Sequence, residues 1–362
     1  MSTRVLVVDD SAVFRRIVTE ALTGLPEVEV VGSASNGRLA LSRLESVRPD
    51  LLTVDIEMPE MNGIELLQAI NESGSPAGTI VLSSLTRRGG ELTMRALELG
   101  AFDFLTKPEA TNPAAGIAEL RNRLAPMLRA FQRKREIRSL LSPGTKMAAT
   151  PGDTRNAAPS PARYVPRSGP PMVLVGVSTG GPAALAELLP AIPKDFGAPV
   201  LVVQHMPPLF TQALAASLER KCSLRVKEAE SDEIAMAGGV YLAPGGKQMK
   251  IAAGPKGEIV VKLTDDPPEN NCRPAVDYLF RSAALGFPGR AIAVVLTGMG
   301  QDGTQGLKLL KRSGCFSVAQ DEATSVVFGM PRAAVEAGLV DSVLPLNAIA
   351  QCLLRQVNGV RQ

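Results

Sequence analysis

Short apolar runs alternate with amphipathic stretches through the first part of the chain. The runs suit buried strands better than helices because they are short, and they occupy residues 5–8, 28–32, 51–54, 79–82 and 102–105. Apolar positions at helical spacing follow each run, at residues 13–23, 38–47, 64–71, 91–99 and 114–139. Strands that alternate with helices in this way predict a doubly wound parallel sheet of the α/β class.

The second part of the chain continues this alternation after an aperiodic segment. Residues 142–171 are dominated by Pro, Gly, Ser, Thr and Ala, which predicts a linker. Beyond it, strands are expected at residues 172–177, 200–203 and 291–296, and helices at residues 182–189, 210–221, 275–285, 304–312 and 331–337. We therefore expect a first domain over residues 1–125, a helix extension and linker over residues 126–170, and a second doubly wound, mainly parallel α/β domain over residues 171–358.

Composition agrees with a soluble two-domain protein. The chain has 362 residues, of which 45% are hydrophobic and 21% charged, and its net charge of +3 is too small to indicate binding to nucleic acid. The four cysteines are scattered without a C-x-x-C pair, and the amino terminus leads into only a short apolar run. We expect a cytoplasmic protein that does not insert into a membrane.

In the first domain, acidic, hydroxyl and basic side chains follow the predicted strands. Asp9 and Asp10 follow the first strand, Asp55 the third, Ser83 the fourth and Lys107 the fifth. The three carboxylates would meet at one edge of the sheet and repel one another unless a hard cation such as Mg²⁺ neutralised them. Asp55 could then attack a phosphoryl group while Lys107 and Ser83 stabilise its oxygens. A single such residue would favour helix capping or loop solvation; five at the correct strand ends favour a site.

In the second domain, the predicted strands lead into a serine, a histidine and an aspartate. Ser178 lies in a G-x-S-x-G turn, His205 is the only histidine of the chain, and Asp302 lies in a glycine-rich turn. These are a nucleophile, a general base and an orienting carboxylate for ester hydrolysis, which needs no cofactor. Backbone N–H groups near Thr179 and Met299 are candidate oxyanion donors. The Thr179 side chain has two further interpretations, a hydrogen bond to His205 or a helix cap.

Other functions fit the second domain less well. A dinucleotide-binding turn requires an acidic residue after the next strand, where this chain has Gln204 and His205, and no Gly-Lys-Ser/Thr sequence follows the turn as in a P-loop. A DNA-binding output requires a basic recognition helix, which the sequence does not offer. An output that binds protein without catalysis is the main alternative, and substitution of Ser178 distinguishes it from an enzyme.

The first domain resembles the receiver domain of two-component response regulators. The resemblance rests on VVDDS at residues 7–11, DIEMP at residues 55–59 and TKP at residues 106–108. It implies phosphorylation by a chemotaxis-type histidine kinase. The implied Mg²⁺ ligands are Asp10, Asp55 and the backbone carbonyl of Glu57, with Asp9 acting mainly through water. It further implies that Asp55 is the phosphoacceptor, and that the phosphate-sensing residues are Ser83, Lys107 and the aromatic Phe104. Plain core packing is an equally good interpretation of Phe104.

The second domain resembles the CheB family of chemotaxis methylesterases. The resemblance rests on GVSTGGP at residues 176–182, QHM at residues 204–206, RPAVD at residues 273–277 and LTGMGQDG at residues 296–303. It implies hydrolysis of glutamate γ-methyl esters on methyl-accepting chemoreceptors, and deamidation of receptor glutamines. Gln248 and Cys272 stand where many relatives have histidine. We interpret Cys272 as a tolerated, half-buried or surface substitution rather than a reactive thiol.

The order of the two domains suggests how they are coupled. We expect the unphosphorylated receiver to block the face that carries Ser178, and phosphorylation of Asp55 to favour an open arrangement. The output is then a phosphorylation-activated methylesterase.

Overall fold

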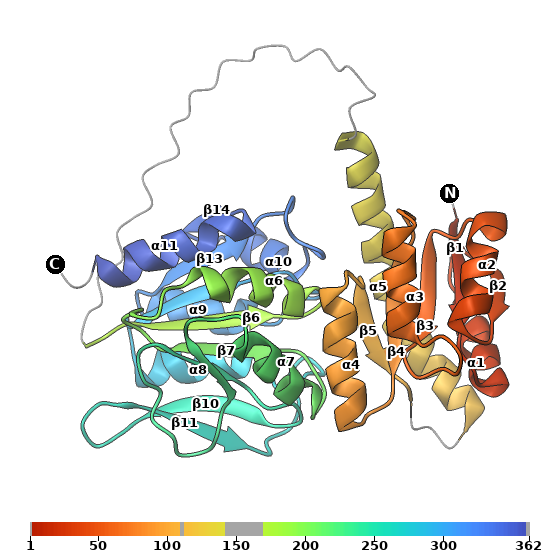
Figure 1. Ribbon diagram of the computed structural model, residues 1–362. Coiled ribbons are helices and arrows are strands. Elements are labelled where there is room, and N and C mark those ends of the chain that lie inside the picture. The colour runs from red at the N-terminus through yellow and green to blue at the C-terminus, as the bar shows by residue number, and fades with distance from the viewer. Residues whose placement is uncertain (1, 109–111, 142–168, 360–362) are drawn as a thin grey trace, which may run out of the picture. The chain divides into compact units, whose positions relative to one another are not determined.

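The computed structural model describes residues 2–108, 112–141 and 169–359. The chain divides into two compact units, Met1–Gln132 and Arg133–Gln362, which are described separately (Figure 1). Most of the predicted linker, residues 142–168, lies outside the described residues.

The first unit is a five-stranded parallel sheet with the strand order β2-β1-β3-β4-β5. Its strands are β1 (Thr3–Val8), β2 (Val28–Ala34), β3 (Leu51–Asp55), β4 (Gly78–Ser83) and β5 (Asp103–Thr106). Its helices are α1 (Ala12–Thr23), α2 (Gly37–Val47), α3 (Gly63–Glu72), α4 (Arg87–Glu98) and α5 (Pro113–Leu141). The doubly wound (βα)5 prediction is confirmed. The chain reverses its winding direction between β1 and β3, where this fold places its ligands.

Helices pack on both faces of this sheet. On one face, Leu6 and Leu52 of the strands pack with Leu44 of α2 and Leu66 of α3. On the other, the Arg121 guanidinium of α5 donates to backbone carbonyls of α1, so these two helices lie side by side. The sheet is therefore covered on both sides, as its continuous apolar strands require.

The second unit is a seven-stranded parallel sheet with the order β14-β13-β12-β6-β7-β9-β8. Its strands are β6 (Met172–Val177), β7 (Val200–Gln204), β8 (Arg225–Glu228), β9 (Gly239–Leu242), β12 (Ala291–Val295), β13 (Phe316–Gln320) and β14 (Ser342–Leu344). A separate antiparallel hairpin joins β10 (Gln248–Ala253) to β11 (Ile259–Thr264). The mainly parallel prediction is confirmed, and the winding reverses between β6 and β12.

The helices of this unit cover both faces of its sheet (Figure 1). They are α6 (Gly181–Leu188), α7 (Phe210–Glu219), α8 (Val276–Gly286), α9 (Thr304–Arg312), α10 (Met330–Glu336) and α11 (Leu346–Asn358), with a short 3₁₀ helix at Leu189–Ala191. One large core joins the sheet, α8, α9 and the hairpin, through residues such as Phe280, Leu307 and Met249. The hairpin is thus part of the domain's core.

Two helices differ from the predictions, and strands β8, β9, β10, β11, β13 and β14 were not predicted. Helix α4 begins at Arg87 rather than residue 91, because the Thr86 hydroxyl accepts a hydrogen bond from Gly89 N–H at 2.9 Å and so caps an earlier start. Helix α11 was not predicted at all.

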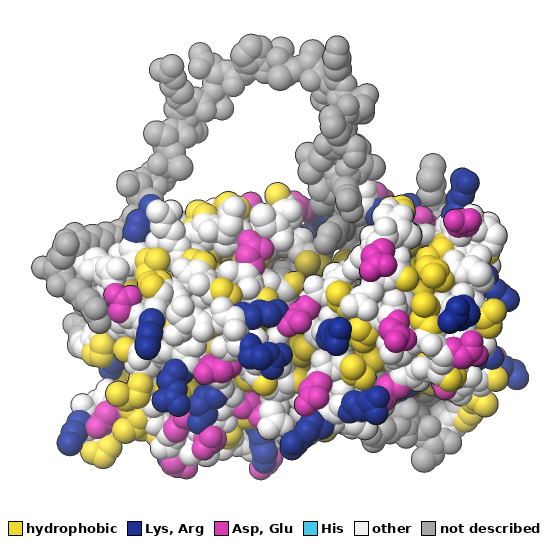
Figure 2. Space-filling view, viewed as in Figure 1, with side chains coloured by type: hydrophobic (Ala, Val, Ile, Leu, Met, Phe, Trp, Pro, Cys, Tyr) yellow, Lys and Arg dark blue, Asp and Glu magenta, His cyan; other side chains and the backbone are white. Residues whose placement is uncertain are grey.

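Of the described helices, none combines the length and apolar character that a membrane span needs. On the face drawn in Figure 2, basic and acidic side chains are interspersed rather than separated by sign.

Candidate active site and phosphorylation site

Ser178 and His205 lie next to each other because their strands are neighbours in the sheet. Val177 and Gln204, the last residues of β6 and β7, are paired in register, and His205 N–H donates to the Val177 carbonyl at 3.1 Å. The Gln204 side-chain amide donates to the carbonyls of Ser178 at 2.9 Å and His205 at 3.3 Å. The two strand ends are therefore tied together directly behind the predicted nucleophile and base.

Asp302 reaches His205 from the loop between β12 and α9. Its Oδ2 lies 2.8 Å from His205 Nε2, and the two side chains are only 3% and 13% exposed. Backbone N–H groups of Val276, Asp277 and Gly303 also donate to this carboxylate, at 2.7, 3.1 and 3.0 Å. Because so many donors satisfy it, Asp302 can remain ionised although it is buried.

The hydrogen bonds of this pair set the charge of both groups. Burial disfavours a charged imidazole, but the hydrogen bonds to Asp302 and Cys272 outweigh burial and raise the pKa of His205 to about 9. Burial alone would raise the pKa of Asp302, yet its bonds to His205 and to the backbone N–H groups lower it. The structure thus favours an ionised Asp302 beside a strongly basic imidazole.

Both ring nitrogens of His205 have partners. An ionised carboxylate only accepts hydrogen bonds, so Nε2 carries the proton toward Asp302, and Nδ1 is the nitrogen free to act as a base. Nδ1 lies 3.5 Å from the Cys272 thiol, which is half-buried. Within the described residues, no hydrogen bond joins Ser178 Oγ to His205. Cys272 therefore contacts the base, and the sequence around Cys272 did not predict this contact.

The predicted oxyanion donors border Ser178. In the described part of the chain, the backbone N–H groups of Thr179 and Met299 have no acceptor, which leaves them available to a ligand. The turn before Met299 packs on the nucleophile, since a Cβ on Gly298 would meet Ser178 Cβ at 2.9 Å. The helix-cap interpretation of Thr179 does not hold, because Gly180 is the N-cap residue of α6.

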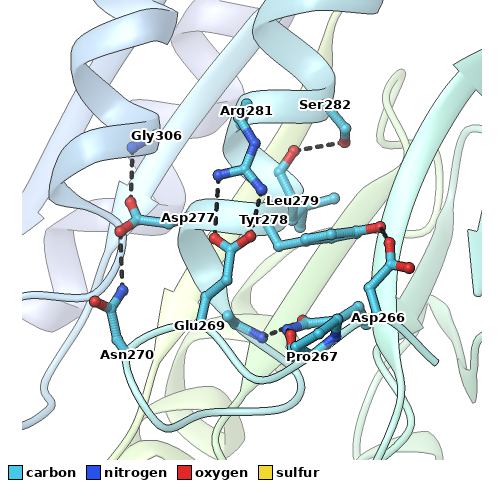
Figure 3. A network of polar contacts seen from close by, with 12 residues as sticks. Asp266, Pro267, Glu269, Asn270, Asp277, Tyr278, Leu279, Arg281, Ser282 and Gly306 are labelled. Carbon is cyan, nitrogen blue, oxygen red and sulfur yellow. Dashed lines mark hydrogen bonds and ion pairs between the residues drawn. The ribbon is translucent and has the colours of Figure 1, made fainter. Parts of the chain in front are cut away.

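Asn270 and Asp277 belong to the site, although sequence reasoning missed their roles. The Asn270 amide donates to Asp302 Oδ1 at 2.9 Å and to Asp277 Oδ2 at 3.0 Å, and Figure 3 shows the bond to Asp277. Asp277 is buried and also accepts from Gly306 N–H at 2.6 Å. Burial and the nearby charge of Asp302 raise the pKa of Asp277. Asp277 lies within the RPAVD motif, but nothing in the motif shows that it meets Asp302.

In the first unit, the predicted phosphorylation-site residues converge at the edge where β1 and β3 end. Carboxylate oxygens of Asp9, Asp10 and Asp55 lie within 4.8 Å of one another. The Lys107 ammonium lies 2.8 Å from both Asp9 and Asp55. Burial raises the pKa of each of these two carboxyls, and Lys107 offsets part of the effect. A cluster of crowded oxygen donors with incomplete charge compensation fits a hard divalent cation.

The other predicted residues of this site surround it. The buried Ser83 hydroxyl donates to the Gly89 carbonyl at 3.2 Å, at the start of α4. Phe104 is half-buried and packs against the apolar cluster beneath α4. The Glu57 side chain accepts from the Ser84 hydroxyl at 2.9 Å. The residues that follow β3 and β4 are thus linked beside Asp55.

The fold and these two sites define a class of protein, a response regulator whose receiver is joined to an α/β hydrolytic output domain. Residues 5–116 match the response regulator receiver domain, and residues 173–353 match the CheB methylesterase domain. The chain belongs to the CheB methylesterase family.

Relatives and a solved structure agree with this assignment. The protein-glutamate methylesterase/protein-glutamine glutaminase of Desulfotalea psychrophila is 49% identical over 98% of each chain. The protein of the same name from Nocardioides is 43% identical over 98% of this chain and 95% of its own. The crystal structure of the Thermotoga maritima CheB methylesterase catalytic domain is 44% identical, with a TM-score of 0.51, and covers 52% of this chain and 98% of that one. The chain is thus a hydrolase under receiver control.

Proposed function

We propose that the second unit hydrolyses γ-methyl esters of glutamates in methyl-accepting chemoreceptors, with Ser178, His205 and Asp302 as its triad. The observation that supports this most directly is the buried 2.8 Å contact between His205 and Asp302, directly beside Ser178 at the switch point of the sheet. The protein acts in the cytoplasm, where the modified receptor segments lie.

Ser178 is the nucleophile of the first step. Its Oγ attacks the ester carbonyl carbon while Nδ1 of His205 takes its proton, and the tetrahedral oxyanion is held by the N–H groups of Thr179 and Met299. The C–O bond to the methoxy group then breaks, and His205 returns the proton to it, so that methanol leaves. The product is an acyl-enzyme on Ser178.

Water completes the reaction by the same route. His205 removes a proton from water, the hydroxide attacks the acyl carbon, and the proton passes to Ser178 Oγ as the glutamate carboxylate is released. Asp302 keeps the proton of the imidazole on Nε2 and stabilises the imidazolium in both steps. A glutamine side chain would follow the same path with ammonia as the leaving group, which accounts for deamidation.

In the first unit, we propose that Asp55 accepts a phosphoryl group from a histidine kinase of the chemotaxis type. Asp10, Asp55 and the Glu57 carbonyl would hold Mg²⁺, with Asp9 acting through water. Bound Mg²⁺ neutralises the crowded carboxylates and the oxygens of the phosphoryl group. Lys107 pairs with the transferred group, while Ser83 and Phe104 respond to it. Phosphorylation stimulates the methylesterase.

The test is release of methanol from a methylated chemoreceptor fragment. Ser178→Ala should lower Mg²⁺- and phosphodonor-stimulated release by at least about 10⁴-fold, because the nucleophile is lost. Ser231→Ala is the matched control, since Ser231 is an exposed serine of the same unit, and it should keep full activity. Equal release by Ser178→Ala and Ser231→Ala would reject the triad. No methanol release by the unsubstituted protein would instead favour an output that binds without catalysis.

A further inference from the structure

A tight turn carries Asn270 to the active site. Glu269 and Cys272 exchange two backbone hydrogen bonds, at 3.1 and 2.8 Å, and the two residues between them have positive φ angles, 52° for Asn270 and 60° for Asn271. Positive φ at both central residues is the requirement of a type I′ turn, and asparagine tolerates that conformation better than most residues. The turn Glu269–Cys272 is therefore a compact unit with a defined backbone.

This turn contacts both members of the His205–Asp302 pair. From its tip, the Asn270 amide donates one hydrogen bond to Asp302 and one to Asp277, at 2.9 and 3.0 Å. From its end, the Cys272 thiol lies 3.5 Å from His205 Nδ1. One short segment thus contacts both the carboxylate and the base.

Residues flanking the tip hold the turn to the body of the domain (Figure 3). Glu269 forms an ion pair with Arg281 of α8, with nitrogen to oxygen distances of 3.0 and 2.5 Å. The Tyr278 hydroxyl donates to Asp266. The buried Gln248 amide donates to the Pro267 carbonyl at 3.1 Å. These contacts hold the residues that lead into the turn, and the side-chain hydrogen bonds of the tip itself come from Asn270.

Asp302 does not need Asn270 for its own placement. Three backbone N–H groups already donate to its carboxylate, as described above, and these belong to the starts of α8 and α9. Asp277 is likewise held, by Gly306 N–H at 2.6 Å. Asp302 and Asp277 therefore have backbone donors that do not depend on Asn270, and the Asn270 bonds join the turn to both carboxylates.

We propose that Asn270 is a positioning residue that pins the turn Glu269–Cys272 to Asp302 and Asp277 and so holds the Cys272 thiol against Nδ1 of His205. Nδ1 is the nitrogen that Ser178 must reach, so the turn determines how often the base is available to the nucleophile. The effect of the turn on catalysis rests on the proposed function, whereas the contact between Cys272 and His205 does not.

The groups around His205 determine the direction in which its pKa should change. The groups that act on the imidazole are Asp302 and Cys272, with Asp277 one step further away. In the protonated imidazole, Nδ1–H donates to the Cys272 sulfur, which favours the charged ring, so withdrawal of this sulfur should make His205 less basic. Loss of a donor to Asp302 would act in the opposite sense, because a less satisfied carboxylate attracts the imidazolium more strongly. The direction of the pKa change of His205 in an Asn270 variant therefore distinguishes an effect through Cys272, which lowers the pKa, from an effect through Asp302, which raises it.

The experiment is an NMR titration of the full chain labelled with ¹⁵N-histidine. His205 is the only histidine, so its ring signals need no assignment by mutation. Asn270→Gly should lower the pKa of His205 by about one unit, the size expected for one hydrogen bond. Asn271→Gly is the matched control, because both positions have positive φ, which glycine adopts freely, and the Asn271 side chain makes no hydrogen bond among the described residues. It should leave the titration unchanged.

A double-mutant cycle tests whether Asn270 acts through Cys272. Cys272→Ala should lower the pKa of His205 as Asn270→Gly does, and the double variant should shift it no further than either single variant. An unchanged or raised pKa in Asn270→Gly, or additive shifts, would overturn the proposal. The titration needs no turnover, so it is independent of the proposed function. If Asn270→Gly lowers the pKa of His205 as expected but no Ser178-dependent methanol release is found, the proposed function is rejected and the role of Asn270 stands.

Discussion

At the scale of single residues, His205 shows how the local environment adapts one side chain to its task. Its Nε2 faces a carboxylate that receives backbone hydrogen bonds, and its Nδ1 faces a thiol. The ring is therefore held from both sides, with the basic nitrogen directed away from Asp302. This differs from triads in which the carboxylate binds Nδ1 and the serine binds Nε2.

The basicity of His205 predicts a pH profile. Only the neutral imidazole can accept the proton of Ser178, and the pKa of this group is raised to about 9. Between pH 7 and about 9, kcat/KM for methanol release should therefore rise by roughly tenfold per pH unit, and it should level off above that. Initial rates from pH 6 to pH 10 measure this. A rise that ends near pH 6.5 would contradict the geometry around the ring.

The residues of the candidate site were predictable where a motif placed them after a predicted strand. Ser178, His205 and Asp302 are such residues, because neighbouring parallel strands end at the same edge of the sheet. Asn270 and Cys272 are not, because their contacts depend on a turn folding back over that edge, and the sequence of the turn does not show which face it covers.

At the scale of elements, the end of β12 and the end of β6 pack without space for a side chain between them. A Cβ at Gly298 would lie 2.4 Å from Met330 Sδ and 2.9 Å from Ser178 Cβ. Gly298 also accepts hydrogen bonds from Gly329 at 3.0 Å and Met330 at 2.8 Å, which fix its backbone. The position of the nucleophile therefore depends on the absence of a side chain at Gly298, in the loop that follows β12.

This packing predicts the effect of one added methyl group. Gly298→Ala should displace Ser178 and lower kcat by about a hundredfold, because small misplacements of a nucleophile are costly. Steady-state methanol release measures the loss, and circular dichroism checks the fold. Gly286→Ala is the control, since a Cβ there has only the Ile251 carbonyl within reach, at 3.9 Å. Equal activity of the two variants would show that the Ser178 site tolerates the change.

Element boundaries were predictable where the apolar period was strong and less so where caps decide them. Thr86 starts α4 early by a side-chain hydrogen bond, and the period of the following residues does not reveal it. The short strands β8 and β14 each pair with one neighbouring strand at the edge of the sheet, and so few residues give a weak periodic signal.

At the scale of the whole molecule, the same structural principle occurs twice. Each unit is a doubly wound parallel sheet, and each places its charged or nucleophilic side chains where the winding reverses, between β1 and β3 or between β6 and β12. One unit gathers carboxylates and a lysine, and the other gathers a serine, a histidine and an aspartate. Regulation and hydrolysis therefore belong to separate cores.

Separate cores predict separable activities. Asp55→Asn removes the proposed phosphoacceptor and leaves every residue of the second unit unchanged, so it should abolish stimulation of methanol release by Mg²⁺ and acetyl phosphate and preserve the unstimulated rate. The measurement compares both proteins with and without the phosphodonor. Stimulation that survives in Asp55→Asn would mean that another group accepts the phosphoryl, or that the small molecule acts elsewhere.

The sequence by itself determined the two α/β domains, the family, and the residues at the strand ends, because periodicity and strand-end motifs depend on local chemistry. Only the tertiary structure decided which nitrogen of His205 faces Asp302, that Cys272 contacts the other, and that Asn270 links two buried carboxylates. These contacts join residues far apart in the chain, and they arise from the way a turn packs over the end of a sheet.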